Sequence, residues 1–129
     1  MGKFLNPDNQ AFQDVLNSSI YVDKTELLDY INSVINTTSK FICNSRPHRF
    51  GKSITADMMT AYYSKGCDSE EMFSHLKIAE KESFRKNLNQ YDVIHLDVQW
   101  CMMDAGAAEK TVDYINRHIL EELKQEYPS

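Results

Sequence analysis

A basic segment in the first half of the chain ends in Gly51-Lys52-Ser53, three residues that suit a phosphate chain. Gly51 removes a Cβ where backbone and phosphate must approach closely. Lys52 offers a mobile positive charge to the β- and γ-phosphates, and the Ser53 hydroxyl can enter the coordination shell of Mg²⁺. The sequence therefore predicts a site for a nucleoside triphosphate and Mg²⁺, formed by Arg46, Pro47, His48, Arg49, Phe50, Gly51, Lys52, Ser53 and Ile54.

The front of this segment departs from the usual phosphate-binding loop, G-x-x-x-x-G-K-[ST], also called Walker A. Arg46 stands at the first glycine position, where a side chain makes a left-handed backbone costly. Pro47 fixes its own φ and favours an extended Arg46. We expect a loop shaped differently from the usual cradle. The residues leave one alternative open, a basic loop in which Ser53 merely caps the following helix.

Such a loop needs a strand before it and a helix after it. Residues 41–43 are a short apolar run that predicts a buried parallel strand. Residues 54–63 carry apolar side chains at helical spacing, so a helix should begin at Ser53 and present its N-terminus to the phosphates. The whole assignment depends on residues 41–43 lying in a sheet and on the 46–53 turn facing the opening of that helix.

The rest of the chain alternates between the same two kinds of element. Helical spacing of apolar residues predicts helices over residues 10–17, 24–36 and 107–126, and one or two short helices over 69–89. Residues 93–98 form a second strong strand candidate. Strands that alternate with helices are typical of an α/β domain with a parallel sheet.

Length and composition restrict the possible classes of protein. With 129 residues the chain is one domain at most, and a formal net charge of −5 gives no bulk attraction to nucleic acid or an anionic membrane. No apolar run reaches the roughly 20 residues of a membrane span. The three cysteines, Cys43, Cys67 and Cys101, fit neither a disulfide framework nor a zinc site, so we expect a reduced, cytoplasmic protein.

Two segments together resemble a known family. Residues 21–25 (YVDKT), followed by residues 46–53 (RPHRFGKS), are similar to the YVDKT and RPRRFGK[ST] motifs of the predicted AAA-ATPase-like family of bacterial proteins. Members often carry a C-terminal PD-(D/E)XK nuclease-like domain. The resemblance implies ATP and Mg²⁺ as ligands and a three-layer P-loop NTPase fold with parallel strands. It also implies that Arg46 is normal for the family, whereas His48 replaces its usual arginine.

The same resemblance implies that residues 1–129 are the N-terminal portion of one ATPase domain, truncated at its C-terminal side. The family's acidic Walker B strand, LIDEYD-like, has no counterpart after Asp97, which is itself a weak candidate for that acid. We therefore assign no catalytic residue and expect hydrolysis only with the missing part of the domain or another subunit. The predicted strands 41–44 and 93–98 would then lack the neighbouring strands that normally satisfy their backbone hydrogen bonds, which is costly for buried groups. A non-catalytic interaction module and a small phosphotransferase are the alternatives.

Asp23-Lys24-Thr25 has two interpretations as well. Segments just before the loop strand often approach the nucleotide, so these residues could lie beside it. The other interpretation is a helix N-cap with a solvated lysine, because Asp23 and Glu26 have the spacing of a capping box.

Overall fold

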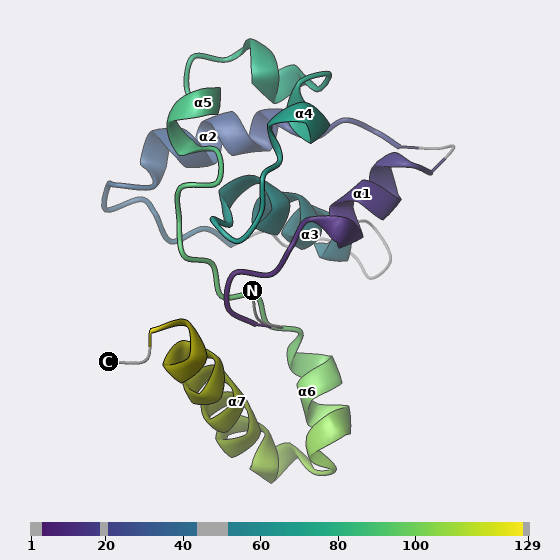
Figure 1. The fold of residues 1–129 in the computed structure, drawn as a ribbon, viewed down its shortest axis with the longest axis vertical. Helices are drawn as coiled ribbons and strands as arrows, with labels where there is room; N and C mark the ends of the chain where they lie inside the picture. Colours follow the sequence, from purple (N-terminus) through teal and green to yellow (C-terminus); the bar gives the residue numbers. More distant parts are fainter. Residues whose placement is uncertain (1–3, 19–20, 44–51, 128–129) are drawn as a thin grey trace.

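The structure is a computed structural model that describes residues 4–18, 21–43 and 52–127, and that part of the chain is dominated by helices (Figure 1). In chain order the helices are α1 (Gln10–Leu16), α2 (Glu26–Val34), α3 (Lys52–Tyr63), α4 (Glu70–Phe73), the 3₁₀ helix η1 (Lys77–Glu80), α5 (Phe84–Asn87), α6 (Val98–Ala105), the 3₁₀ helix η2 (Ala108–Lys110) and α7 (Thr111–Glu126).

The three-layer α/β fold with parallel strands, predicted from the sequence, is wrong for the part of the chain that the structure describes. Residues 41–43 belong to no strand there, and Phe41 is 86% exposed. Residues 93–97 are extended but make only one isolated antiparallel bridge, between Ile94 and Leu5, and Val98 already begins α6. A strand persists only with a hydrogen-bonded neighbour. Among the described residues the first segment has none, and the backbone of the second pairs only with the short N-terminal segment.

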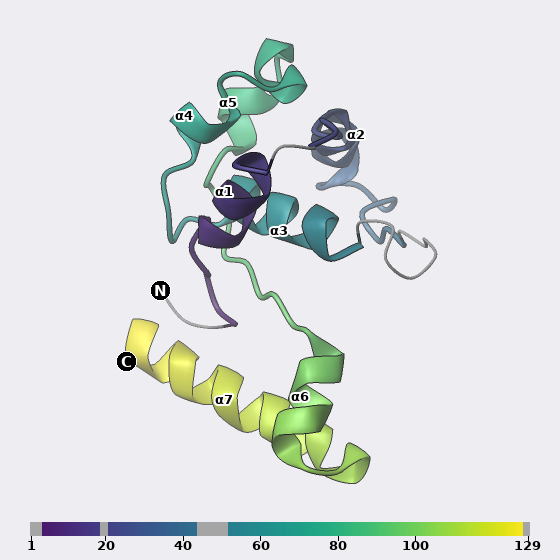
Figure 2. The same ribbon diagram turned by 90° about the vertical axis from the view of Figure 1, so that its right-hand side faces the viewer.

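The larger of two hydrophobic clusters lies between α3 and the helices around it. The fully buried Tyr62 of α3 lies near Phe73 of α4 and Phe84 of α5, with ring centroids 5.5 and 6.0 Å apart. α1 packs against α3, and Figure 2 shows the two helices close together. The predicted helical spacing is confirmed for these elements, because eight of the residues that carried it are buried: Phe12, Leu28, Ile31, Met58, Ala61, Tyr62, Phe73 and Phe84.

The second cluster belongs to a helical hairpin made of α6, η2 and α7, which stands apart from the other helices (Figures 1 and 2). Its buried residues are Phe4, Cys101 and Tyr114. Backbone N–H groups of Phe4 and Leu5 donate to the Glu122 carboxylate of α7, at 3.0 and 2.9 Å. The hairpin is therefore held to the rest of the molecule partly through the N-terminal segment.

A second polar junction ties the end of α7 to the main body. The Asp92 carboxylate accepts hydrogen bonds from Asn6 at 2.9 Å and from the Tyr127 hydroxyl at 2.7 Å, and it pairs with Lys65 at 2.9 Å. These three donors lower the pKa of Asp92 to about 2. The junction joins four segments that are far apart in the sequence.

Candidate functional site

Most of the predicted phosphate-binding loop lies outside the described residues. Residues 44–51 are not described, which includes Arg46, Pro47, His48, Arg49, Phe50 and Gly51, so the predicted shape of the loop stays a prediction. Lys52 and Ser53 are the first two residues of α3, although their side chains also lie outside the description. Ile54 is 42% exposed.

Helix α3 supplies one half of the predicted strand–loop–helix unit. It has 12 residues and begins at Lys52, which confirms the predicted helix. Its first turn contains no acidic residue, so no carboxylate there opposes an anion at the free N–H groups and positive dipole end. The strand half is wrong, because residues 41–43 lie outside any sheet in the described chain. One of the two conditions on which the whole assignment depended therefore fails, and only the Gly51-Lys52-Ser53 motif and the start of α3 at Lys52 are left to support a polyphosphate site.

Asp23 and Thr25 form a clamp between the start of α2 and the 3₁₀ helix η1. The Thr25 N–H and hydroxyl both donate to Asp23 Oδ1, at 2.8 and 2.6 Å, while Asp23 Oδ2 accepts the Lys77 N–H at 2.8 Å. Thr25 Oγ1 in turn accepts the buried Ile78 N–H at 3.1 Å. We call these two residues and their partners in η1 the α2–η1 clamp.

The clamp accounts for Asp23 and Thr25 without a ligand. Thr25 is fully buried, whereas Lys24 is exposed. Burial raises the pKa of Asp23, but the hydrogen bonds from Thr25 and the Lys77 N–H lower it by more, so the net shift is downward. Of the two interpretations of this segment, the geometry favours the structural one with a solvated lysine. The capping box itself is absent, since Thr25 is the N-cap of α2 and makes no side-chain cap bond.

Asp97, the weak candidate for a Walker B acid, is the N-cap of α6. Its carboxylate accepts the Trp100 N–H at 3.0 Å and its side chain is exposed. A carboxylate that accepts the free N–H groups of a helix start already has a structural role. The signal for α6 was present in the sequence, because an aspartate before a helix is a usual start signal, but the apolar run 93–98 obscured it.

A polar cluster that the sequence analysis missed lies along α3. The Thr60 hydroxyl of α3 is hydrogen-bonded to Nδ1 of His95 at 3.0 Å. Asp57, the only acidic residue of α3, is half-buried. Burial raises the pKa of its carboxyl group, and the nearby His95 lowers that pKa by less. Asp57 lies one helical turn after Ser53, a spacing that could have drawn attention to it. His95 could not be found in this way, because only the fold brings it to α3.

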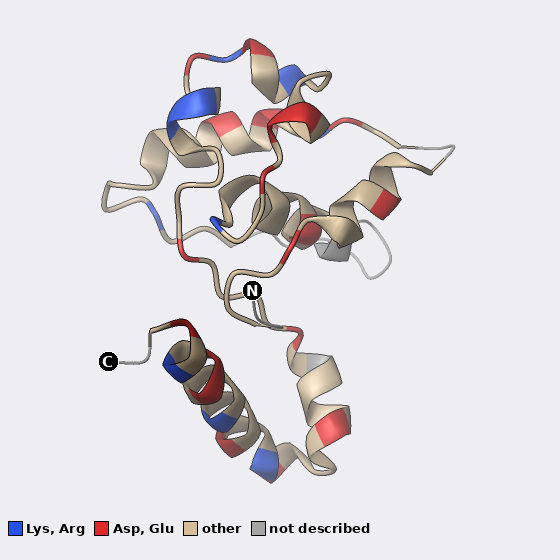
Figure 3. Ribbon diagram, in the orientation of Figure 1, with Lys and Arg blue, Asp and Glu red and all other residues tan. Residues whose placement is uncertain are grey.

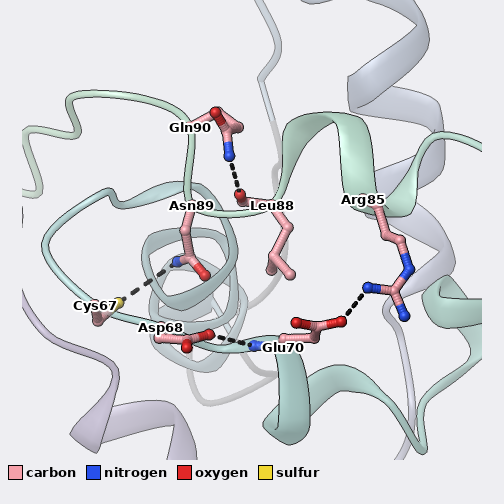
Figure 4. A pocket seen from close by; sticks show the side chains of 7 residues that line it. All are labelled: Cys67, Asp68, Glu70, Arg85, Leu88, Asn89 and Gln90. Carbon is pink, nitrogen blue, oxygen red and sulfur yellow. Dashed lines mark hydrogen bonds and ion pairs between the residues drawn. The ribbon is translucent and has the colours of Figure 1, made fainter.

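A pocket of about 270 Å³ lies between α4 and α5 (Figure 4). Acidic α4 faces basic α5 across it (Figure 3), and Arg85 pairs with Glu70 at its edge. Asn89 on its wall has a positive φ of 54°, and its side-chain amide donates to the Ala61 and Ser64 carbonyls at 3.0 and 2.7 Å. Its Oδ1 accepts the Ser69 N–H at 2.8 Å. The Asn89 side chain and the Arg85–Glu70 pair are thus already engaged by other groups of the protein.

Comparison with known proteins identifies the family of this chain. A family model described as "Predicted AAA-ATPase" matches residues 9–129, which includes the clamp, the loop and α3. The chain belongs to the predicted AAA-ATPase family. Membership supports a nucleotide-binding role in general terms, and ATP with Mg²⁺ is what such a family would generally use. No curated protein and no solved structure shows significant similarity to this predicted AAA-ATPase.

Two kinds of feature are absent from the described residues of this predicted AAA-ATPase. Among them, no group of three or more His, Cys, Asp or Glu side chains is arranged to hold a metal ion. None of the helices that the structure describes is both long enough and apolar enough to cross a membrane.

Proposed function

We propose that this predicted AAA-ATPase binds ATP together with Mg²⁺ through residues 46–54, as part of a single ATPase domain to which residues 1–129 contribute the N-terminal portion. One observation carries the proposal: the family match spans the Gly51-Lys52-Ser53 segment, and that segment enters a 12-residue helix at Lys52. Free N–H groups at a helix start bind phosphate through hydrogen bonds and the helix dipole.

Each residue of the segment has a separate task in this proposal. Gly51 allows the backbone to approach the phosphates, and Lys52 binds the β- and γ-phosphates. Ser53 would hold Mg²⁺, which neutralises charge on the phosphate oxygens when it is bound. The basic residues before Gly51 add positive charge to the loop. Hydrolysis needs in addition an acidic residue near the metal and a group that orients the attacking water, supplied by another part of the domain or by another subunit.

The test is Lys52→Ala, with Lys24→Ala as the matched control. Both changes remove a lysine, but Lys24 is an exposed residue of the α2–η1 clamp segment. A charge-assisted contact contributes about 1.5–3 kcal/mol, so Lys52→Ala should weaken ATP·Mg²⁺ binding about 10- to 150-fold in calorimetry. Lys24→Ala should leave the affinity within about twofold. Equal affinity of Lys52→Ala and the unmodified protein would overturn the proposal.

A further inference from the structure

Helix α7 carries more apolar surface than its own hairpin covers. Within the described chain it packs mainly against α6 and η2, and the other described helices lie away from it in Figures 1 and 2. Its inward side contributes Tyr114, Ile115 and Ile119 to the smaller hydrophobic cluster. Val112 and Leu120, in contrast, are 66% and 54% exposed. A helix tends to bury its apolar side, so these residues are open to a contact that the hairpin does not make.

The exposed apolar residues of α7 form one stripe instead of lying at scattered positions. Each residue turns a helix by about 100°, so Val112, Leu120 and Leu123 lie within about 80° of one another around its axis. Asn116 occupies the same side in the turn between them. Leu123 is half-buried, yet within the described chain it belongs to neither hydrophobic cluster. A stripe at this spacing is typical of a helix that packs along a second helix.

A row of four charged residues follows one flank of this stripe. Their signs alternate along the helix (Figure 3), in the order Asp113, Arg117, Glu121 and Lys124. All four side chains are exposed, and in the part of the chain that the structure describes none of them makes an ion pair. An alternating row of four is its own complement when it is reversed. In an antiparallel pair, Asp113 of one copy would therefore lie opposite Lys124 of the other, and Arg117 opposite Glu121.

We propose that the exposed face of α7 binds the same face of a second copy of this chain, with the two α7 helices antiparallel. A two-fold contact needs a surface that is complementary to itself, and the charged row of α7 meets that requirement. In the register that pairs Arg117 with Glu121, Leu120 lies beside the two-fold axis and is buried in both copies. The inference is independent of the proposed function, because this face belongs to the hairpin and not to residues 46–54.

The test reverses the charges of the row and measures self-association of the 129-residue chain by sedimentation equilibrium at low salt. The unmodified chain should form a dimer. Arg117→Glu and Glu121→Arg each convert both copies of this pair into like-charge pairs, so each variant alone should associate about 10- to 100-fold more weakly. An equimolar mixture of the two variants should recover the original affinity. Mixing alters nothing within either chain, so recovery can come only from the contact between copies.

The apolar stripe is tested with Leu120→Ser. Met103→Ser is the matched control, because Met103 is a 76% exposed apolar residue of α6, outside the proposed face. Since Leu120 is buried in both copies, its loss should weaken the dimer more than about 100-fold, whereas Met103→Ser should stay within about twofold. Circular dichroism checks that each variant is folded.

Two results would overturn the inference. One is a chain that stays monomeric at about 0.1 mM, in which case another part of the domain or a different protein covers the α7 face. The other is a mixture of Arg117→Glu and Glu121→Arg that associates no better than either variant alone. ATP·Mg²⁺ binding by a monomeric chain would leave the proposed function standing.

Discussion

Thr25→Val tests whether the α2–η1 clamp stabilises the fold. The change replaces one hydroxyl by a methyl group of similar size at a fully buried position. Two hydrogen bonds are lost, the one that the hydroxyl donates to Asp23 and the one that it accepts from the Ile78 N–H. Both lie inside the main body, where water does not readily replace them.

The size of the effect follows from these two bonds. An orphaned buried N–H costs about 1–3 kcal/mol, and a hydrogen bond to a charged group contributes about 1.5–3 kcal/mol. Asp23 keeps the backbone N–H groups of Thr25 and Lys77 as donors. Losing the bond from the Thr25 hydroxyl to Asp23 should therefore cost near the lower limit, about 1.5 kcal/mol. We expect Thr25→Val to lower the free energy of unfolding by about 2–4 kcal/mol, a large part of the stability of a small domain.

The control is Thr25→Ser, which keeps the hydroxyl and removes one methyl group, at a cost of about 1 kcal/mol. Urea unfolding is followed by far-ultraviolet circular dichroism and by Trp100 fluorescence, because Trp100 lies in the separate hairpin and reports on two-state behaviour. ATP·Mg²⁺ affinity should stay unchanged in both variants under folding conditions. The structural interpretation of this segment would be wrong if the Thr25→Val variant proved as stable as the Thr25→Ser variant. It would also be wrong if the Thr25→Val variant alone lost nucleotide binding while it was still folded.

Two more predictions concern polar residues outside the clamp. Asn89→Gly keeps the positive φ but loses three hydrogen bonds between the side chain and backbone groups, so melting experiments should show a loss of about 2–4 kcal/mol in the free energy of unfolding. Asn89→Ala should cost about 1 kcal/mol more, because alanine is strained at a positive φ. The folded-state pKa of Asp92 is about 2, below its ordinary value of 3.8, so its stabilising contribution is complete above about pH 4 and is lost as the pH falls toward 2. Asp92→Asn should show a smaller fall in melting temperature over that interval, and an identical fall in both proteins would contradict the assignment.

The helices could be predicted from the sequence because their signal is local. Apolar residues such as Phe12, Leu28 and Met58 recur at helical spacing and are buried in the structure. Strands could not be predicted in the same way, since an apolar run becomes a strand only when another segment provides hydrogen-bond partners. Phe41 is apolar yet 86% exposed, and Ile94 is 52% exposed, so composition alone misled at both positions.

In the candidate site, too, the local features could be predicted from the sequence and the long-range contacts could not. The place of Lys52 and Ser53 at a helix start follows from a short contiguous motif, and the structure begins α3 there. The contact between Thr60 and His95 spans 35 residues, and the clamp bond from Lys77 to Asp23 spans 54. Neither pairing leaves a periodic or spacing signal, so both required the three-dimensional fold.

One helix pair connects the α2–η1 clamp with the helix that begins at Lys52. The clamp fixes the start of α2, and Asn32 near its end donates to the Tyr62 hydroxyl at 3.0 Å and accepts from the Tyr63 hydroxyl at 2.7 Å. Both tyrosines belong to the last turn of α3, the helix that begins at Lys52. A rigid α3 keeps its first turn in place only if its last turn is anchored. Asp23 and Thr25 therefore help to stabilise the helix pair that carries the proposed phosphate site, a role in the fold that requires no contact with nucleotide.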